Sequence, residues 1–188
     1  MGINYSIYLK QPDAFCALSF EQYCQSINLD IKVHPSFVFF EDDGFLPIRL
    51  VDARFANGSG NNVFLSGFEI FSSEYCHISP TRKKSIGFLS KLFKPKPTDE
   101  TPFDSAIKNS KILIDLYCGN ADSFEVMLAY AFSSYLVKFC NGIFYDPQSG
   151  QFCENYSHLE DEIEEIVKVL QNQANTGELL THKFNEWL

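Results

Sequence analysis

The side chains that most often perform catalysis or bind metals are scattered through this sequence. The cysteines and histidines are Cys16, Cys24, Cys76, Cys118, Cys140, Cys153, His34, His77, His158 and His182. No two cysteines form the C-x-x-C pair that supplies the close ligands of a structural zinc site. We therefore predict no metal site and no cofactor, and we expect the thiols to be reduced and mostly buried.

Cys76 and His77 are adjacent and combine a nucleophile with a base. Neighbouring side chains of a strand point to opposite faces, so this pair is not expected to form one site. The sequence also lacks the motifs G-x-x-x-x-G-K-[ST], G-x-G-x-x-G, G-x-S-x-G and H-E-x-x-H. We therefore predict that the protein is not an enzyme. Two alternatives stay open: a small cytosolic thiol-dependent hydrolase with a Cys/His/Asp site assembled from distant positions, and a general protein-interaction module.

Asp146 is the strongest single candidate for a catalytic carboxylate, and it opens the segment DPQSG. An Asp followed by Pro, with Gly150 closing the segment, is also the pattern of a turn in which the carboxylate accepts backbone N–H groups. A catalytic carboxylate needs a partner that shifts its pKa or shares a proton, and the spacing places no second acid beside this one. We therefore predict that Asp146 and Gly150 are structural residues of a turn.

The chain has a formal net charge of −9 that is unevenly distributed. Residues 79–98 carry six basic side chains and no acidic one, so the rest of the chain is more acidic than the total indicates. Such a body repels nucleic acid and attracts a cationic partner over long range. We predict a protein partner and no direct contact with nucleic acid. The N-terminal segment lacks a basic start followed by an apolar run, which predicts a cytoplasmic location.

The densest acidic cluster on a predicted loop consists of Glu41, Asp42 and Asp43. Loops on a rigid sheet are common recognition sites. Asp52 and Glu74 lie near predicted strand ends and are expected to extend the same patch. These five residues are our candidate partner-binding set.

Two other interpretations of the acidic residues stay open. The segment Asp42-Asp43-Gly44 also has the composition of a simple hairpin turn. A rival acidic surface is the outer face of the last helix, although charged outer faces usually serve only solvation. That face carries Asp161, Glu162, Glu164 and Glu165.

The candidates lie among strand patterns and two apolar helix patterns. Residues 122–139 are apolar nearly all round, which predicts a buried helix, and residues 157–172 carry one apolar stripe. A run of strand patterns precedes residue 75. We predict a single α+β domain over residues 1–188, with a mainly antiparallel sheet of five or six strands. The buried central helix packs on this sheet, with the C-terminal helix beside it.

The individual elements follow from periodicity and capping residues. We expect strands at 3–10, within 30–55, and at 63–75, 111–119 and 143–146, a helix at 19–27, and a short terminal helix ending at Trp187. We assign helix starts to Ser19, to Asp122 with Glu125, and to Ser157 with Glu160, and a helix end to Asn141-Gly142, with the glycine left-handed.

Prolines bound a basic insertion at about residues 79–105, within which SIGFLSKLF has helical spacing with lysines on its other faces. A basic amphipathic turn of this kind can touch anionic lipid or an acidic partner. We favour a surface loop that tucks its apolar side onto the body. No apolar run approaches the length that crosses a bilayer, so we predict no membrane span.

Several segments taken together resemble one protein family. A turn after Phe39-Phe40 is followed by GFLPIRLVD, then by FLSGFEIF, and, after a strand and an apolar helix, by NGIFYDPQSG. This arrangement, over roughly residues 36–75 and 110–152, resembles small bacterial immunity proteins of toxin–immunity systems such as contact-dependent growth inhibition. The chain departs from the pattern at Asn141-Gly142, where the resemblance leads us to expect Gly-Gly.

The resemblance implies a protein that binds and blocks a toxin domain encoded by a neighbouring gene. The family shares no catalytic residues, so none is transferred to this chain. Many toxin domains of such systems are nucleases with basic clefts, which an acidic inhibitor would complement. The predicted function is therefore an immunity protein that neutralises a cognate toxin domain, with a nuclease as one candidate, by an acidic surface. The identity of the toxin and the oligomeric state do not follow from the sequence.

Overall fold

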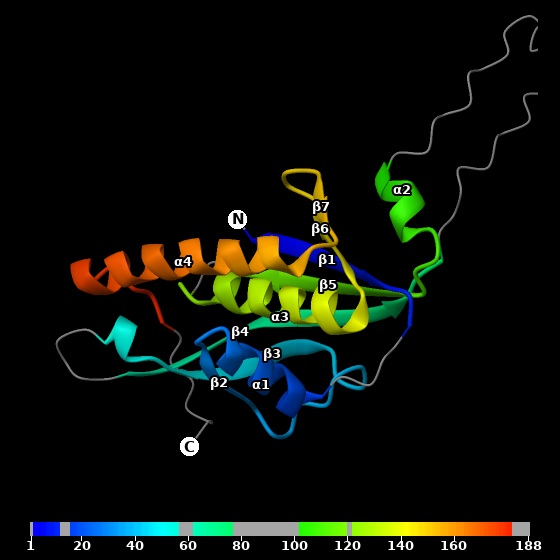
Figure 1. Cartoon of the computed structure of the whole chain (residues 1–188). Coiled ribbons are helices and arrows are strands. Elements are labelled where there is room, and N and C mark those ends of the chain that lie inside the picture. The colour runs from blue at the N-terminus through cyan, green and yellow to red at the C-terminus, as the bar shows by residue number, and fades with distance from the viewer. Residues whose placement is uncertain (1, 12–15, 57–61, 77–101, 120–121, 182–188) are drawn as a thin grey trace, which may run out of the picture.

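The computed structural model describes residues 2–11, 16–56, 62–76, 102–119 and 122–181, which build one antiparallel sheet with helices packed on it (Figure 1). The strands are β1 (Ile3–Leu9), β2 (Asp30–Val33), β3 (Gly44–Val51), β4 (Val63–Glu74), β5 (Ile112–Cys118), β6 (Ile143–Asp146) and β7 (Gln151–Cys153). The helices are α1 (Ala17–Ser26), α2 (Pro102–Ile107), α3 (Glu125–Cys140), α4 (Tyr156–Thr176) and the 3-10 turn η1 (Ala53–Phe55). The strand order is β2-β3-β4-β5-β1-β6-β7.

The predicted α+β class is confirmed, although the described residues contain seven strands rather than five or six. The strand that the sequence did not indicate is β7, which follows β6 after a four-residue turn. Its three residues are too few to show the alternation by which a strand is recognised. Residues 38–40, expected to lead as a β-rich run into the Asp43-Gly44 turn, are themselves irregular, and Phe40 is left-handed with φ of 70°.

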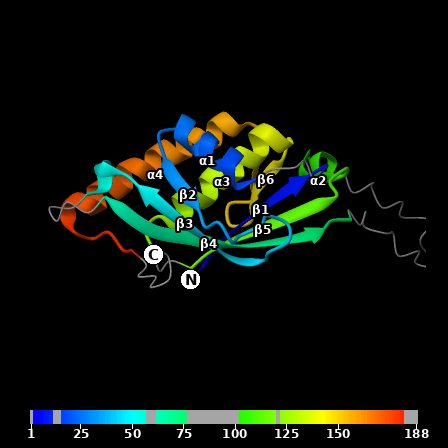
Figure 2. The same ribbon diagram turned by 90° about the horizontal axis from the view of Figure 1, so that it is seen from below.

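Three helices cover one face of the sheet. Figures 1 and 2 show α1, α3 and α4 on the same side of it. Helix α3 contacts β1, β4, β5 and β6 below it and both other helices beside it. Its side chains, among them Leu128, Phe132 and Leu136, are therefore buried nearly all round. The predicted burial of this helix is confirmed, and it explains why the helix has no polar face.

Helices α1 and α4 begin before the residues that were predicted to cap them. The N-cap of α1 is Cys16, and the hydroxyl of Ser19 lies inside the first turn, where it accepts a 3.2 Å hydrogen bond from the N–H of Cys16. Helix α4 is capped by Asn155, whose side chain accepts a 3.0 Å bond from the N–H of Ser157. In both helices the serine that was predicted to be the N-cap lies within the first turn, and the actual N-cap precedes that turn.

Helix α3 begins at Glu125, three positions after the predicted start at Asp122. Asp122 instead shapes the turn before the helix. Its Oδ1 accepts hydrogen bonds from the N–H of Phe124 at 2.6 Å and from the hydroxyl of Ser66 on β4 at 3.0 Å. This buried carboxylate therefore ties the start of the central helix to the sheet.

The end of α3 corrects the predicted role of its glycine. Asn141, not Gly142, takes the left-handed conformation, with φ of 49°. Gly142 is needed for close packing, because a Cβ there would lie 2.9 Å from Cδ2 of Leu9 and 3.0 Å from Cγ2 of Ile7. The chain therefore returns onto β1 with no room for a side chain at this position.

Some predicted features fall on residues that the structure does not describe. Most of the basic insertion lies at 77–101, outside the described residues, and the expected helix ending at Trp187 lies outside them too. The last part of the insertion forms α2. Within the described ranges, no helix combines the length and the apolar character needed to cross a membrane.

Candidate binding surface on the open face of the sheet

The sheet face turned away from α3 carries exposed aromatic side chains on β4 and β5. Phe71 and Tyr117 are 39% and 43% exposed, and their rings meet edge to face with centroids 5.7 Å apart. Each follows a residue buried toward the helices, Ile70 and Leu116, as the alternation of a strand requires. Large aromatic side chains left together in solvent are typical of interaction surfaces. We call this side of β3, β4 and β5 the open face.

Two carboxylates lie on the open face beside these rings. The strand register pairs Glu69 with Tyr117 and Phe71 with Asp115. Asp115 accepts a 2.6 Å hydrogen bond from the hydroxyl of Ser6 on β1, which holds its carboxylate in place. Glu69 is exposed. Aromatic rings and negative charges therefore alternate across the middle of this face.

Helix α2 covers the neighbouring part of the same side of the sheet. Its Phe103 stacks on Tyr145 of β6, with ring centroids 4.4 Å apart. The same ring contacts Tyr8 of β1 and Phe152 of β7 at 5.5 and 5.7 Å. Within the part of the chain that the structure describes, no helix packs in this way on β3, β4 and β5. Phe71 of β4 and Tyr117 of β5 therefore stay partly exposed.

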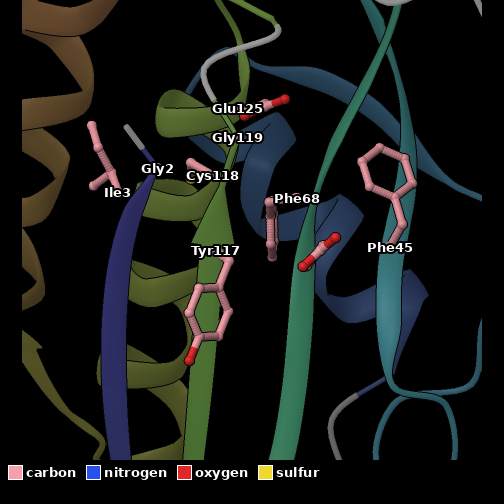
Figure 3. A pocket seen from close by; sticks show the side chains of 9 residues that line it. Gly2, Ile3, Phe45, Phe68, Tyr117, Cys118, Gly119 and Glu125 are labelled. Carbon is pink, nitrogen blue, oxygen red and sulfur yellow. The ribbon is translucent and has the colours of Figure 1, made fainter.

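A pocket of about 300 Å³ is hollowed into the open face beside Tyr117 (Figure 3). Phe45 on β3 and Tyr117 on β5 stand at its two sides, with Phe68 of β4 between them. Glu69 and Glu125 supply carboxylates to its lining. No lysine, arginine or histidine belongs to the described residues that line it. The pocket therefore has aromatic walls and a negative charge.

The shape of this pocket depends on Gly67 of β4. A Cβ at this position would lie 2.1 Å from the carbonyl oxygen of Leu46 and 2.7 Å from Cζ of Phe45. The ring of Phe45 thus occupies the space that a side chain of residue 67 would fill. Gly67 has φ of 158°, a conformation that residues with a side chain rarely adopt, and it directs a Cβ toward the backbone of β3, so this position of the strand pair favours glycine.

Glu125 lines the pocket from within the molecule and is only 3% exposed. It is the first residue of α3, where an acidic side chain interacts favourably with the helix dipole. The charge of Glu125 also acts on Cys118 of the neighbouring strand β5. Burial, with a contribution from Glu125, raises the pKa of the Cys118 thiol to about 12. Cys118 therefore stays protonated at neutral pH, and the negative charge in this region belongs to the carboxylates.

The predicted acidic loop lies at the edge of the open face. Glu41, Asp42 and Asp43 are all exposed. The carboxylate of Asp42 accepts a 2.7 Å hydrogen bond from the N–H of Val38, and that of Asp43 accepts a 2.9 Å bond from the N–H of Ser72. Both aspartates therefore help to shape the loop, and the carboxylate of Asp43 lies beside Ser72, the residue that follows Phe71. Their contact with a partner stays a prediction.

The structure separates the two residues expected to extend this loop. Glu74 is exposed and lies two positions beyond Ser72 on β4, close to the loop. Asp52 follows the opposite end of β3, about 27 Å away at the usual rise of a strand. It is 8% exposed and forms a paired contact with the guanidinium of Arg54 at 2.6 to 3.0 Å. The structure therefore does not bring Asp52 together with the acidic loop, and its contact with a partner stays a prediction.

The rival acidic surface has the character of a solvated helix face. Asp161, Glu162, Glu164 and Glu165 are exposed along α4. Glu165 forms a 2.6 Å ion pair with Lys168 of the same helix. Exposed pairs of this kind contribute little to stability. This face lies on the helical layer, on the other side of the sheet from the aromatic cluster.

Asp146 occupies a turn, as predicted. One carboxylate oxygen accepts a 2.8 Å hydrogen bond from the N–H of Gln148, and the other accepts a 2.8 Å bond from the hydroxyl of Ser149. The loop closes with a 2.9 Å bond from the N–H of Gly150 to the Asp146 carbonyl, and Gly150 is left-handed with φ of 70°. Both oxygens of the Asp146 carboxylate therefore accept hydrogen bonds within the turn that connects β6 and β7.

A second pocket, of about 350 Å³, lies between this hairpin and the start of α4. Asp146, Cys153 and His158 all contribute to its lining, which makes it the nearest arrangement to the thiol site left open by the sequence. The Cys153 thiol donates its hydrogen bond to the carbonyl of Asn155 at 3.0 Å, not to His158. With Asp146 engaged in its turn, the three groups do not form a nucleophile–base–carboxylate relay in this structure.

The cysteines divide evenly between buried and accessible positions. Cys24, Cys118 and Cys140 are buried, Cys153 is half-buried, and Cys16 and Cys76 are exposed, all as free thiols. Hydrogen bonding to Ser19 lowers the pKa of the Cys16 thiol. Within the described residues, no group of three or more His, Cys, Asp and Glu side chains is placed to hold a metal ion.

Comparisons with protein-family models, curated proteins and solved structures found no match to this chain. The open face is therefore the feature from which function is inferred. Its main residues, Glu69, Phe71 and Tyr117, were not candidates in the sequence. Alternation within β4 and β5 separates these positions from the buried ones. Which face the helices leave uncovered depends on the strand order, which no local pattern contains.

Proposed function

We propose that this chain is an immunity protein that binds a toxin domain through the open face of its sheet and thereby blocks the toxin. The observation that carries the proposal is the uncovered pair of aromatic side chains, Phe71 and Tyr117, flanked by Glu69 and Asp115. Protein-binding surfaces combine an aromatic centre with charged groups around it. An inhibitor of this kind needs such a surface and no catalytic machinery of its own.

The charge of the molecule supports a basic partner. The chain carries a net charge of −9, and the open face presents carboxylates beside its aromatic rings. Complementary charge accelerates encounter and disfavours wrong partners. The substrate cleft of a nuclease toxin is basic because it holds phosphates, so it has the complementary charge.

The acidic loop has a place in the same proposal. Glu41, Asp42 and Asp43 adjoin the aromatic centre through the contact between Asp43 and Ser72. Charges at the rim of an interface mainly set the association rate, whereas buried aromatic side chains mainly set the dissociation rate. We therefore assign the loop to steering and the aromatic pair to retention of the toxin domain.

Coexpression with the toxin domain encoded by the neighbouring gene tests this proposal. The wild-type chain is expected to restore growth of cells that produce the toxin domain and to bind that domain in purified form. The double variant Phe71→Ser/Tyr117→Ser is expected to lose both properties while remaining folded. Phe139→Ser is the matched control, because Phe139 is also exposed, at 55%, but lies on α3. Equal protection by the double variant and the wild type would exclude the open face.

A further inference from the structure

Arg49 of β3 is a cation whose charge the described part of the fold does not use. Its side chain lies on the open face, because its neighbours Ile48 and Leu50 are fully buried toward the helices. Its Nε is buried and has no hydrogen-bond partner among the described residues. A buried donor without an acceptor is costly, and native proteins contain few such groups. The guanidinium therefore needs an acceptor that folding alone does not supply.

Two other cations of this part of the chain are paired within it. Lys32, which lies opposite Arg49 in the register of β2 and β3, forms a 2.6 Å ion pair with Glu21. Arg54, shortly after β3, bonds to Asp52 at 2.6 to 3.0 Å. Within the described ranges, Arg49 has neither an ion pair nor a hydrogen bond through its guanidinium. Its two terminal nitrogens, unlike Nε, reach the surface of the open face.

The surroundings of Arg49 on the open face are largely apolar. Leu65 lies opposite it on β4 and Pro47 two positions away on β3, and both are half-buried. The acidic residue of β2, Asp30, lies opposite Val51 rather than opposite Arg49. A protein that covers this area removes water from the guanidinium and must therefore supply an acceptor for it.

A carboxylate is the acceptor that fits this position. It pairs with a guanidinium through two parallel N–H···O bonds, which the terminal nitrogens of Arg49 can donate. A polyanion such as nucleic acid would meet the net charge of −9 of the chain. A single acidic side chain on a basic protein avoids that repulsion.

We propose that Arg49 pairs with a carboxylate side chain of the protein bound on the open face. The inference rests on the proposed function, which supplies that protein. Arg49 lies four residues along β3 from Phe45, about 13 Å at the usual strand rise, and Phe45 is in register with Glu69 and Tyr117. An interface of standard size is about 30 Å across and includes both positions. The face then carries two opposite charges, which fix the orientation of the partner.

The affinity of Arg49→Met for the toxin domain tests the pair. Methionine keeps an apolar stem and removes the guanidinium, so we expect binding to weaken about 30-fold. Arg49→Lys keeps the charge without the paired N–H groups and should bind between these two proteins. Lys168→Met removes one positive charge from the exposed face of α4 and should bind as the wild type does.

Urea unfolding separates this role from a structural one. Arg49→Met should leave the unfolding midpoint unchanged or raise it, because the lost Nε donor has no acceptor in the free protein. Arg54→Met should lower the midpoint, since it leaves the buried carboxylate of Asp52 without its partner. A midpoint of Arg49→Met as low as that of Arg54→Met would assign the guanidinium to the fold and overturn the inference.

Variants of the toxin domain identify the carboxylate. Its surface Asp and Glu residues are changed one at a time to Asn and Gln. One such variant should bind the wild-type chain about 30-fold more weakly than the unchanged toxin domain does. The same variant should bind Arg49→Met as the unchanged toxin domain does, because the pair is already absent.

A peptide titration tests Arg49 without the toxin. N-acetyl-Gly-Asp-Gly-amide is added to the ¹⁵N-labelled full chain at constant ionic strength, with N-acetyl-Gly-Asn-Gly-amide as its neutral counterpart. We expect a saturable shift of the Nε–H signal of Arg49 with the Asp peptide and none with the Asn peptide. The absence of this signal from Arg49→Lys assigns it.

The failure of this inference and that of the proposed function are distinguishable. If the wild type binds the toxin domain and Arg49→Met binds it equally well, the inference about Arg49 fails and the proposed function stands. If the wild type does not bind the toxin domain, the proposed function fails and the peptide titration decides the inference. In that case a shift specific to the Asp peptide supports a carboxylate site for another protein, and no shift or equal shifts overturn it.

Discussion

Replacing Gly67 by alanine tests how the sheet and its pocket are built. The added Cβ would lie 2.1 Å from the carbonyl oxygen of Leu46, 2.7 Å from Cζ of Phe45 and 3.0 Å from the Leu46 carbonyl carbon. The nearest of these atoms belongs to the backbone of the neighbouring strand. A side-chain rotation therefore cannot relieve the contact, and β3 and β4 must move apart locally.

The cost follows from these contacts. Forcing one extra carbon into filled space costs about 1–3 kcal/mol, and each ladder hydrogen bond weakened by the separation adds about 1 kcal/mol. We expect Gly67→Ala to lower the free energy of unfolding by about 3 kcal/mol. For a chain of this length, that loss corresponds to a decrease of about 10 °C in the melting temperature.

Urea unfolding of three variants measures the effect. Gly150→Ala is the control for loss of a glycine: nothing lies within 4 Å of its Cβ, but its φ of 70° is unfavourable, so we expect a loss of about 1 kcal/mol. Adding Phe45→Ala to Gly67→Ala removes the ring contact but not the contact with the Leu46 carbonyl, so stability should not return. If Gly67→Ala unfolds within 1 kcal/mol of the wild type, the close strand approach is not what requires glycine.

Three further predictions concern the turn, the acidic loop and the thiols. Asp146→Ala should lower the free energy of unfolding by about 1 kcal/mol through lost turn hydrogen bonds, whereas a folded Asp146→Asn protein that fails to bind the toxin domain would return Asp146 to the candidate site. Charge reversal at Asp42 and Asp43 should slow association with the toxin domain and flatten its salt dependence in stopped-flow measurements; unchanged rates and slopes would exclude the loop. Iodoacetamide at neutral pH should modify Cys16, exposed and with a lowered pKa, well before Cys118, whose pKa is about 12. Mass spectrometry that finds Cys118 modified first in the native protein would contradict its burial.

Local chemistry made part of this structure predictable. The all-apolar pattern of α3 indicated its burial, because a helix without a polar face is stable only when it is surrounded. The Asp146 turn was predictable because Asp, Pro and Gly each favour one position of it. The helix starts were less accurate, since Ser19 and Ser157 have capping side chains but lie within the first turn. A short polar residue near a helix start does not by itself specify which turn position it takes.

The binding surface depends on relations that local patterns do not contain. Glu41 and Asp52 are 11 positions apart, yet the intervening strand β3 places them at opposite ends of the sheet. Glu69 and Tyr117 are distant in sequence and become neighbours only because β4 pairs with β5. Glu125 was expected to serve a helix cap, and its place in a pocket wall follows from the approach of α3 to the end of β5. Long-range strand pairing decides these positions.

The central place of β1 has a consequence for how the chain folds. The first strand lies between β5 and β6, and its Ser6 bonds to Asp115, 109 positions later. Strands β2, β3 and β4 follow one another closely and can pair while the chain is being synthesised. β1 can pair on its two sides only after β5 and β6 have been synthesised. Closure of the sheet should therefore be the late, slow step of folding. Until then the nascent chain exposes Tyr5, Ile7 and Leu9, which are buried in the folded protein and offer a binding site to a chaperone that recognises apolar segments.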